Sequence, residues 1–88
     1  MNKRLAFMPE AFEDYLYWQT QDRRTLRRVN ELLQAIQRDN FKGIGKPEPL
    51  KNSSGLWSRR IDDANRLIYR VNDATIEIVE CRSHYGDK

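Results

Sequence analysis

Apolar residues in the first half of the chain recur at the spacing of two amphipathic helices. Pro9 suits the first turn of a helix, where its missing N–H is not needed. Phe12, Tyr15 and Leu16 then follow at positions i, i+3 and i+4, which places them on one helical face. A second stripe with helical spacing comprises Leu26, Val29, Leu33 and Ile36. Between the stripes the pattern breaks at Asp22, a suitable N-cap for the second helix, so the two stripes predict a helical hairpin.

The second half of the chain changes to the two-residue alternation of β-strands. Residues 56–61, 66–71 and 75–81 have this pattern, and a turn is expected at residues 72–73. A further short strand is expected at residues 3–8. Strands joined by tight turns pair antiparallel. The fold class is therefore α+β, with an N-terminal strand and a helical hairpin packed on an antiparallel sheet whose other face is open.

The expected turn also predicts a register for the last two strands. With a two-residue turn, Leu67 would lie opposite Ile78, and Tyr69 would lie opposite Ile76, all under the helices. The residues that alternate with Leu67 and Tyr69 would then face the open side of the sheet. They are Arg66, Ile68 and Arg70. The arginines would face solvent or a ligand at little desolvation cost, so the sheet is expected to have a basic side.

Residues 40–50 contain two glycines and two prolines, which excludes regular structure across this segment. A residue that precedes a proline is restricted to extended geometry. Long irregular segments of compact domains are usually either functional or disordered. The prolines favour an ordered loop, and Glu48 stands between two of them.

The composition limits what the chain can be. Its 88 residues are 39% hydrophobic and 33% charged, which predicts one globular domain over residues 1–88. No apolar run approaches the roughly 20 residues of a membrane span or the roughly 7–15 residues of a signal-peptide core. The lone Cys81 cannot form an internal disulfide. These features predict a cytoplasmic protein.

The charge is uneven along the chain. Sixteen basic and thirteen acidic residues give a net charge of +3, yet residues 9–22 carry four acids and no base. Residues 42–70 carry seven bases and three acids. A basic segment favours polyanions such as nucleic acid, although a well-solvated surface explains the charges equally well.

The candidate chemistry is acid–base chemistry without a metal or another cofactor. One histidine and one cysteine lack the partners that a zinc site requires. RNA can be cleaved by attack of the ribose 2′-OH on the adjacent phosphorus, which needs a base, a charge stabiliser and an acid. Suitable side chains for these three roles are, in that order, Glu48, Arg66 and His84. Each also has a structural explanation, as an exposed loop carboxylate, a solvated strand residue and a surface or capping histidine.

Several stretches, in order along nearly the whole chain, resemble the Txe/YoeB family of toxins. The most specific are Gly-Lys-Pro-Glu-Pro-Leu at residues 45–50 and Gly-Leu-Trp-Ser-Arg-Arg at residues 55–60. The other matching stretches are residues 14–18, 29–33, 65–69 and 81–85. The resemblance implies a RelE-like fold of the microbial-ribonuclease type. It also implies an endoribonuclease that cuts mRNA in the ribosomal A site, against the 16S rRNA surface, and so inhibits translation.

The resemblance further implies partners and site residues. The natural inhibitor would be a YefM-like antitoxin whose disordered tail folds over the toxin in a type II module. Operator DNA would be bound only through that complex, a homodimer is allowed, and no membrane is involved. Glu48 matches the family's general base, His84 its general acid and Arg66 its transition-state stabiliser. The positions that match RNA-binding residues are Lys51, Arg59, Arg60 and Tyr85.

Two features depart from the family pattern. Ser83 stands where a tyrosine often precedes the histidine, and residues 86–88 extend beyond the usual His-Tyr end. Strict alternation also places Arg66 and His84 on opposite faces of the sheet. We therefore expect the last strand to bulge or to end before His84, so that the imidazole reaches the active face.

Two other classes of function compete with the nuclease. One is a ParE-like toxin of related fold that inhibits DNA gyrase without cutting nucleic acid. The presence of both Glu48 and His84 disfavours it, because the ParE relatives lack this acid–base set. The other is a non-catalytic module that binds RNA or protein, which the basic segment alone suggests.

Overall fold

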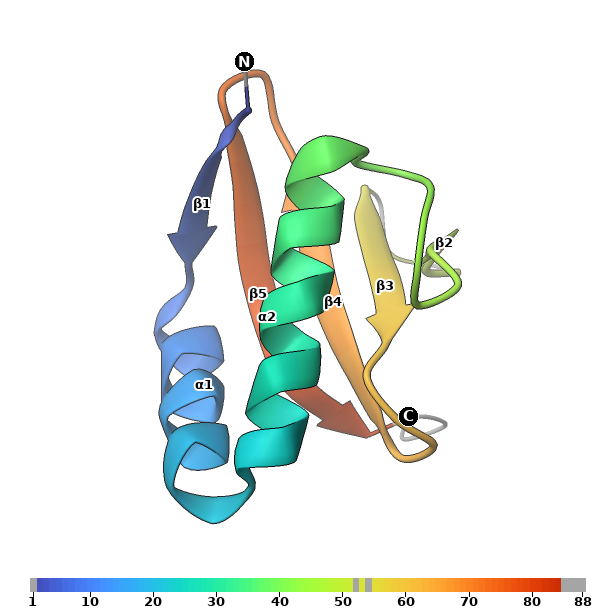
Figure 1. Cartoon of the computed structure of the whole chain (residues 1–88). Coiled ribbons are helices and arrows are strands. Elements are labelled where there is room, and N and C mark those ends of the chain that lie inside the picture. Colours follow the sequence, from blue (N-terminus) through green and yellow to red (C-terminus); the bar gives the residue numbers. More distant parts are fainter. Residues whose placement is uncertain (1, 52, 54, 85–88) are drawn as a thin grey trace.

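In the computed structural model, two helices cover one face of a five-stranded sheet (Figure 1). The structure describes residues 2–51, 53 and 55–84, with the backbone alone for residue 84. In chain order the elements are β1 Arg4–Phe7, α1 Pro9–Gln21, α2 Arg23–Arg38, β2 Glu48–Pro49, β3 Leu56–Arg60, β4 Asn65–Val71 and β5 Thr75–His84. The predicted α+β architecture is confirmed. Among the described residues, neither helix has the length and apolar content needed to span a bilayer.

The strands lie in the order β1-β5-β4-β3-β2. The pairs β3–β4 and β4–β5 are antiparallel, as predicted. Strand β2, which was not predicted, pairs antiparallel with β3. Strand β1 instead runs parallel to β5, with Leu5 opposite Ile76 and Phe7 opposite Ile78. A parallel pair requires a long crossover, and here the crossover is formed by the helices and the other three strands.

The two helices match their apolar patterns to different degrees. In α2, Val29, Leu33 and Ile36 are buried as predicted. In α1, Phe12 and Leu16 are 52% and 43% exposed, and of the predicted stripe only Tyr15 packs against the core. The buried residues of this helix are Ala11 and Trp18. The indole of Trp18 fixes this orientation, because its Nε1 donates a hydrogen bond of 2.7 Å to the carbonyl of Cys81.

Asp22 caps α2, as predicted. Its carboxylate accepts hydrogen bonds from the backbone N–H groups of Arg24 and Thr25 at 3.1 and 3.2 Å, and from the Thr25 hydroxyl at 2.8 Å. The hydrogen bonds from Thr25 contribute most to lowering the pKa of this carboxyl group. The cap allows the chain to reverse within one residue between the two helices.

The predicted register of β4 and β5 is wrong by two residues. Tyr69 lies opposite Ile78, and Val71 lies opposite Ile76. The reason is the position of the turn: the N–H of Asn72 bonds to the carbonyl of Thr75 at 2.8 Å, so the two-residue turn lies at residues 73–74 and not at residues 72–73. An even shift leaves each residue on its predicted face, and Tyr69, Ile76 and Ile78 are all fully buried under the helices.

We predict that this core weakens at alkaline pH. Burial, with a smaller effect of Asp14, raises the pKa of the Cys81 thiol to about 12 from its usual value of 9.0. Burial also raises the pKa of the Tyr69 phenol. Unfolding frees both groups to ionise, so the free energy of unfolding should fall as the pH rises from about 9 towards 12. Urea denaturation at pH 7, 9 and 10.5 measures this fall.

The variant Cys81→Ala provides the control for the thiol. It should lose part of the alkaline decline and keep the part that comes from Tyr69. An identical pH dependence in the variant and the wild type would contradict the role of Cys81.

Candidate active site

The open face of the sheet carries a row of residues that crosses four strands. Glu48 lies opposite Ser58, Ser58 opposite Ile68, and Ile68 opposite Glu80. Ser58 and Ile68 are 2% and 6% exposed and form the floor of this row. The two carboxylates stand at its ends, about 14 Å apart at the backbone for three strand spacings.

A second row, two residues further along, carries positive charge. Arg60 lies opposite Arg66, and Arg66 lies opposite Ser83. Arg66 is only 8% exposed, so the expectation that it faces solvent at little desolvation cost is wrong. Arg60 is half-buried, and its Nη2 lies 2.5 Å from a carboxylate oxygen of the fully exposed Asp63. Two guanidinium groups on neighbouring strands, about 5 Å apart at the backbone, make this end of the open face attractive to a phosphate.

Glu48 and Arg66 occupy positions from which both can reach one phosphodiester. They share the open face and lie two strands and two residues apart, which corresponds to about 12 Å between their Cα atoms. Glu48 is exposed in β2, whereas Arg66 is held within the sheet. The arrangement combines an accessible carboxylate with a positioned cation.

Strand β5 bulges as predicted but does not end before His84. The register between β4 and β5 shifts twice. One shift lies between Arg66 and Ile68 of β4, and the other lies between Ile68 and Tyr69. The two shifts cancel in parity, so the backbone of His84 lies opposite Asn65, at the position that alternates with the pair of Arg66 and Ser83. The bulges therefore do not produce the expected change of face at His84. The histidine side chain and the whole of Tyr85 lie outside the described residues.

The expected contact of Arg59 with RNA is wrong, because this side chain is fully buried on the helix face of β3. Its guanidinium donates hydrogen bonds to main-chain carbonyls of Asp39 at 2.7 Å, Lys42 at 2.9 Å and Ile44 at 3.1 Å. Its Nε donates to the Tyr69 hydroxyl at 3.3 Å. All these acceptors come from the protein, so Arg59 holds the loop that leads into β2.

The same loop makes close backbone contacts with β3. The carbonyl of Gly45 accepts a hydrogen bond of 2.6 Å from the N–H of Arg60. Gly45 has φ +87°, and a Cβ atom there would lie 2.7 Å from Cδ2 of Leu32. The expectation of an ordered loop is confirmed, although its last part forms the two-residue strand β2 rather than irregular structure. The loop thus fixes the backbone from which Glu48 projects.

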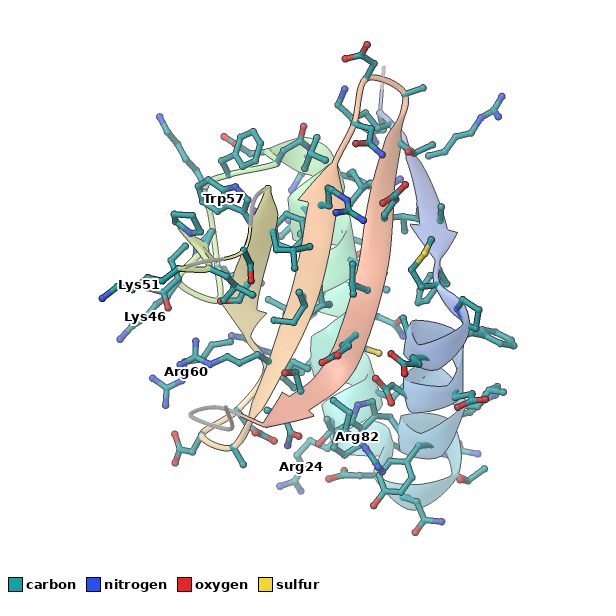
Figure 2. The ribbon with its side chains drawn as sticks, turned by 180° about the vertical axis from the view of Figure 1, so that it is seen from behind. Arg24, Lys46, Lys51, Trp57, Arg60 and Arg82 are labelled. Atoms are coloured by element: carbon teal, nitrogen blue, oxygen red, sulfur yellow. The ribbon has the colours of Figure 1, made fainter. Side chains whose placement is uncertain are left out.

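Lysines border the site on the side of β2. Lys46 and Lys51 are exposed before and after this strand. Figure 2 shows Lys46, Lys51 and Arg60 along the same border of the open face. This border could contact the backbone of a polyanion whose reactive phosphate lies between Glu48 and Arg66.

Glu80 is a charged residue of the open face that the sequence pattern did not predict there. Strict alternation from Ile76 and Ile78 assigns Glu80 to the core, and only the bulge turns it to the open face. The charged residue in an apolar series was the available signal, because an unpaired carboxylate is rarely buried. Among the described side chains, no three or more potential metal ligands gather at one place.

We predict that Arg59→Met disorders the loop and weakens the site. The change leaves several buried carbonyls without a donor, so the free energy of unfolding should fall by about 3 kcal/mol or more. Amide hydrogen exchange at residues 40–48 should become faster by at least tenfold. The matched control is Arg70→Met on the exposed end of β4, where the ion pair with Glu77 should contribute under about 1 kcal/mol. Equal effects of the two changes would contradict the anchoring role.

Comparisons with known proteins identify relatives in sequence and in fold. The family model described as "YoeB-like toxin of bacterial type II toxin-antitoxin system" matches residues 7–85. "Toxin YoeB" of Mycobacterium bovis is 54% identical over 84 residues, covering 94% of this chain and 99% of that protein. The structure of the YoeB dimer from Staphylococcus aureus superposes with a TM-score of 0.90 at 46% identity, covering 97% of this chain and 100% of that one. The heterotetrameric YoeB–YefM complex from the same organism has a TM-score of 0.85 at 46% identity, with the same coverage.

Proposed function

The chain belongs to the YoeB-like toxins of bacterial type II toxin–antitoxin systems, and we propose that it is a ribosome-dependent endoribonuclease that cuts mRNA. The ribose 2′-OH attacks the adjacent phosphorus, and the 5′-oxygen of the next nucleotide leaves. The side chains supply the acid, the base and the stabilising charge without a metal ion. Cutting the message in the ribosomal A site stops translation.

One observation carries this proposal: the strand register puts Glu48 and Arg66 on one open face, with the backbone of His84 at the end of the adjoining strand. Glu48 acts as the base that accepts the 2′-OH proton. His84 is the acid that protonates the leaving 5′-oxygen. Each proton transfer of this kind typically accelerates a reaction by about 10²–10⁴-fold.

Arg66 stabilises the negative charge that builds up on the phosphoryl oxygens. Its 8% exposure means that little water screens the guanidinium. A charge fixed before the reaction needs no reorganisation in the transition state. Lys51 and Arg60 bind the RNA backbone at the border of the site, and Tyr85 is a further contact to the RNA.

The reaction requires Glu48 to be ionised and His84 to be protonated at the same time. The rate should therefore fall at low pH, when the carboxylate takes up a proton, and at high pH, when the imidazole loses one. Glu48 and His84 belong to separate strands. A substitution of Glu48 should therefore remove the fall of the rate at low pH, and a substitution of His84 should remove the fall at high pH.

The partners follow from the solved relatives. The S. aureus proteins were solved as a YoeB dimer and as a YoeB–YefM complex. We propose that this chain likewise binds a YefM-like antitoxin, can form a homodimer, and reaches operator DNA only through the antitoxin complex. Its target, translating ribosomes carrying mRNA, places its action in the cytoplasm.

We predict that His84→Gln lowers the cleavage rate by at least 10²-fold and changes ribosome affinity by less than about threefold. Glutamine keeps a polar side chain of similar reach but cannot act as the general acid. Single-turnover cleavage of mRNA on programmed ribosomes measures the rate, and cosedimentation measures the affinity. Near-full cleavage by the variant would remove His84 from the mechanism.

Primer extension on mRNA from cells that express the chain tests the activity itself. Discrete cuts within reading frames are expected. Stalled replication with intact mRNA would instead identify a ParE-like inhibitor of DNA gyrase, and would overturn the nuclease.

A further inference from the structure

We propose that Tyr17 and Arg82, together with Arg24, form a subsite for the RNA strand beside the cleaved phosphodiester. The Tyr17–Arg82 pair would stack one base, and Arg24 would hold one phosphate. This inference rests on the proposed function, because it places the subsite relative to His84 at the end of β5.

The pair of Tyr17 and Arg82 has the composition of a stacking platform. The guanidinium carbon of Arg82 lies 3.8 Å from the centroid of the Tyr17 ring. Both residues are exposed, and Tyr17 retains 42% of its accessible surface. Unpaired bases of RNA stack on aromatic rings and on arginine planes, and the guanidinium keeps donors for a phosphate or a base edge.

The backbone of β5 places Arg82 at this position. On β4 one residue lies between Arg66 and Ile68, whereas on β5 two residues lie between their partners Ser83 and Glu80. These two residues, Cys81 and Arg82, form the bulge. Both of these neighbours then face α1, whereas neighbours in a regular strand point to opposite faces. The Sγ of Cys81 lies 3.5 Å from the carbonyl of Ala11, while Arg82 covers Tyr17. Bulges commonly re-aim side chains next to active sites.

The platform is fixed relative to the proposed catalytic histidine. Arg82 precedes His84 by two residues, about 7 Å along the strand, which is comparable to the step from one nucleotide to the next. The Tyr17 ring packs edge-on against Trp18, with 5.2 Å between centroids. The Trp18 indole in turn bonds to the carbonyl of Cys81 at 2.7 Å. A base bound here would therefore keep a defined position relative to the end of β5.

Basic residues outnumber acidic ones at the start of α2, the helix end next to the platform. Arg23, Arg24 and Arg27 are exposed in the first turns of α2, where the acidic neighbour is the N-cap Asp22, whose carboxylate interacts electrostatically with Arg24. The helix dipole disfavours cations at this end. None of the ion pairs formed among the described residues involves Arg24 or Arg82. Figure 2 shows these two arginines at the same end of the molecule, where they would attract a phosphate.

The test measures binding of fully 2′-O-methylated RNA oligonucleotides, which 2′-OH attack cannot cleave. Oligonucleotides of ten nucleotides, and versions shortened stepwise from either end, are titrated with the full chain and followed by fluorescence anisotropy. For the wild type, shortening from one end should cause a distinct loss of affinity where the subsite is vacated. Arg82→Gln and Tyr17→Leu should weaken binding of the longest RNA by roughly tenfold, the scale of one lost stacking contact.

The shortened RNA separates a local subsite from a general loss of structure. On the oligonucleotide that no longer reaches the platform, both variants should bind within twofold of the wild type. Arg82→Lys keeps the charge without the planar group, so it should give an intermediate affinity. The matched control is Arg4→Gln, an exposed arginine opposite Thr75 at the other end of β5, which should leave binding within twofold.

Three results would overturn the subsite: no measurable binding of the RNA by the wild type, wild-type affinity in both platform variants, or an equal loss in Arg4→Gln. Cleavage on programmed ribosomes separates this failure from failure of the nuclease. If the subsite works, Arg82→Gln should raise the substrate concentration that gives a half-maximal cleavage rate. The maximal cleavage rate should remain nearly unchanged. If the wild type cuts no mRNA but shows the binding pattern, the nuclease proposal fails and the subsite stands.

Discussion

The buried guanidinium of Arg59 is the interaction on which the arrangement of the open face depends. Three main-chain carbonyls between residues 39 and 44 accept its hydrogen bonds, and a fourth bond goes to the Tyr69 hydroxyl. Asp39 is the C-cap of α2, so the cation also meets the negative end of the helix dipole. Burial of a charge in a domain of 88 residues is costly, and here carbonyl groups, which the loop must satisfy anyway, offset that cost.

This anchor links the two layers of the fold to the chemistry of the sheet. The loop connects the end of α2 to β2, and the latter strand contains only Glu48 and Pro49. So short a strand has too few pairing bonds to fix its own position. Arg59 on one side of β3 and the backbone bond from Arg60 to Gly45 therefore supply the rigidity that the strand lacks. The catalytic base of the proposed nuclease is positioned from the opposite face of the sheet.

The limits of the sequence reading have physical causes. The helical stripe of α2 and the cap at Asp22 were predictable because they depend on local spacing and local hydrogen bonds. The family resemblance matches both Arg59 and Arg60 to RNA-binding positions, and it does not distinguish a buried arginine from an exposed one. Strand alternation alone separates them, since Arg59 pairs with Leu67 of the core and Arg60 pairs with Arg66. The sequence pattern does not show that main-chain carbonyls of residues 39–44 accept hydrogen bonds from Arg59 and so offset the cost of burying its charge.

Bulges in β5 were predicted, but they change the orientation of Glu80 and Arg82 and leave the parity of His84 unchanged. One shift turns Glu80 out of the core series, and the next turns Arg82 towards α1. Because the two cancel, the strand ends with the parity it would have had without either of them. The bulges thus reorient Glu80 and Arg82 within one ten-residue strand. A register read from the turn alone cannot contain this information, since bulges are set by what the side chains contact on neighbouring elements: here, Cys81 against α1 and Arg66 beside Ser83.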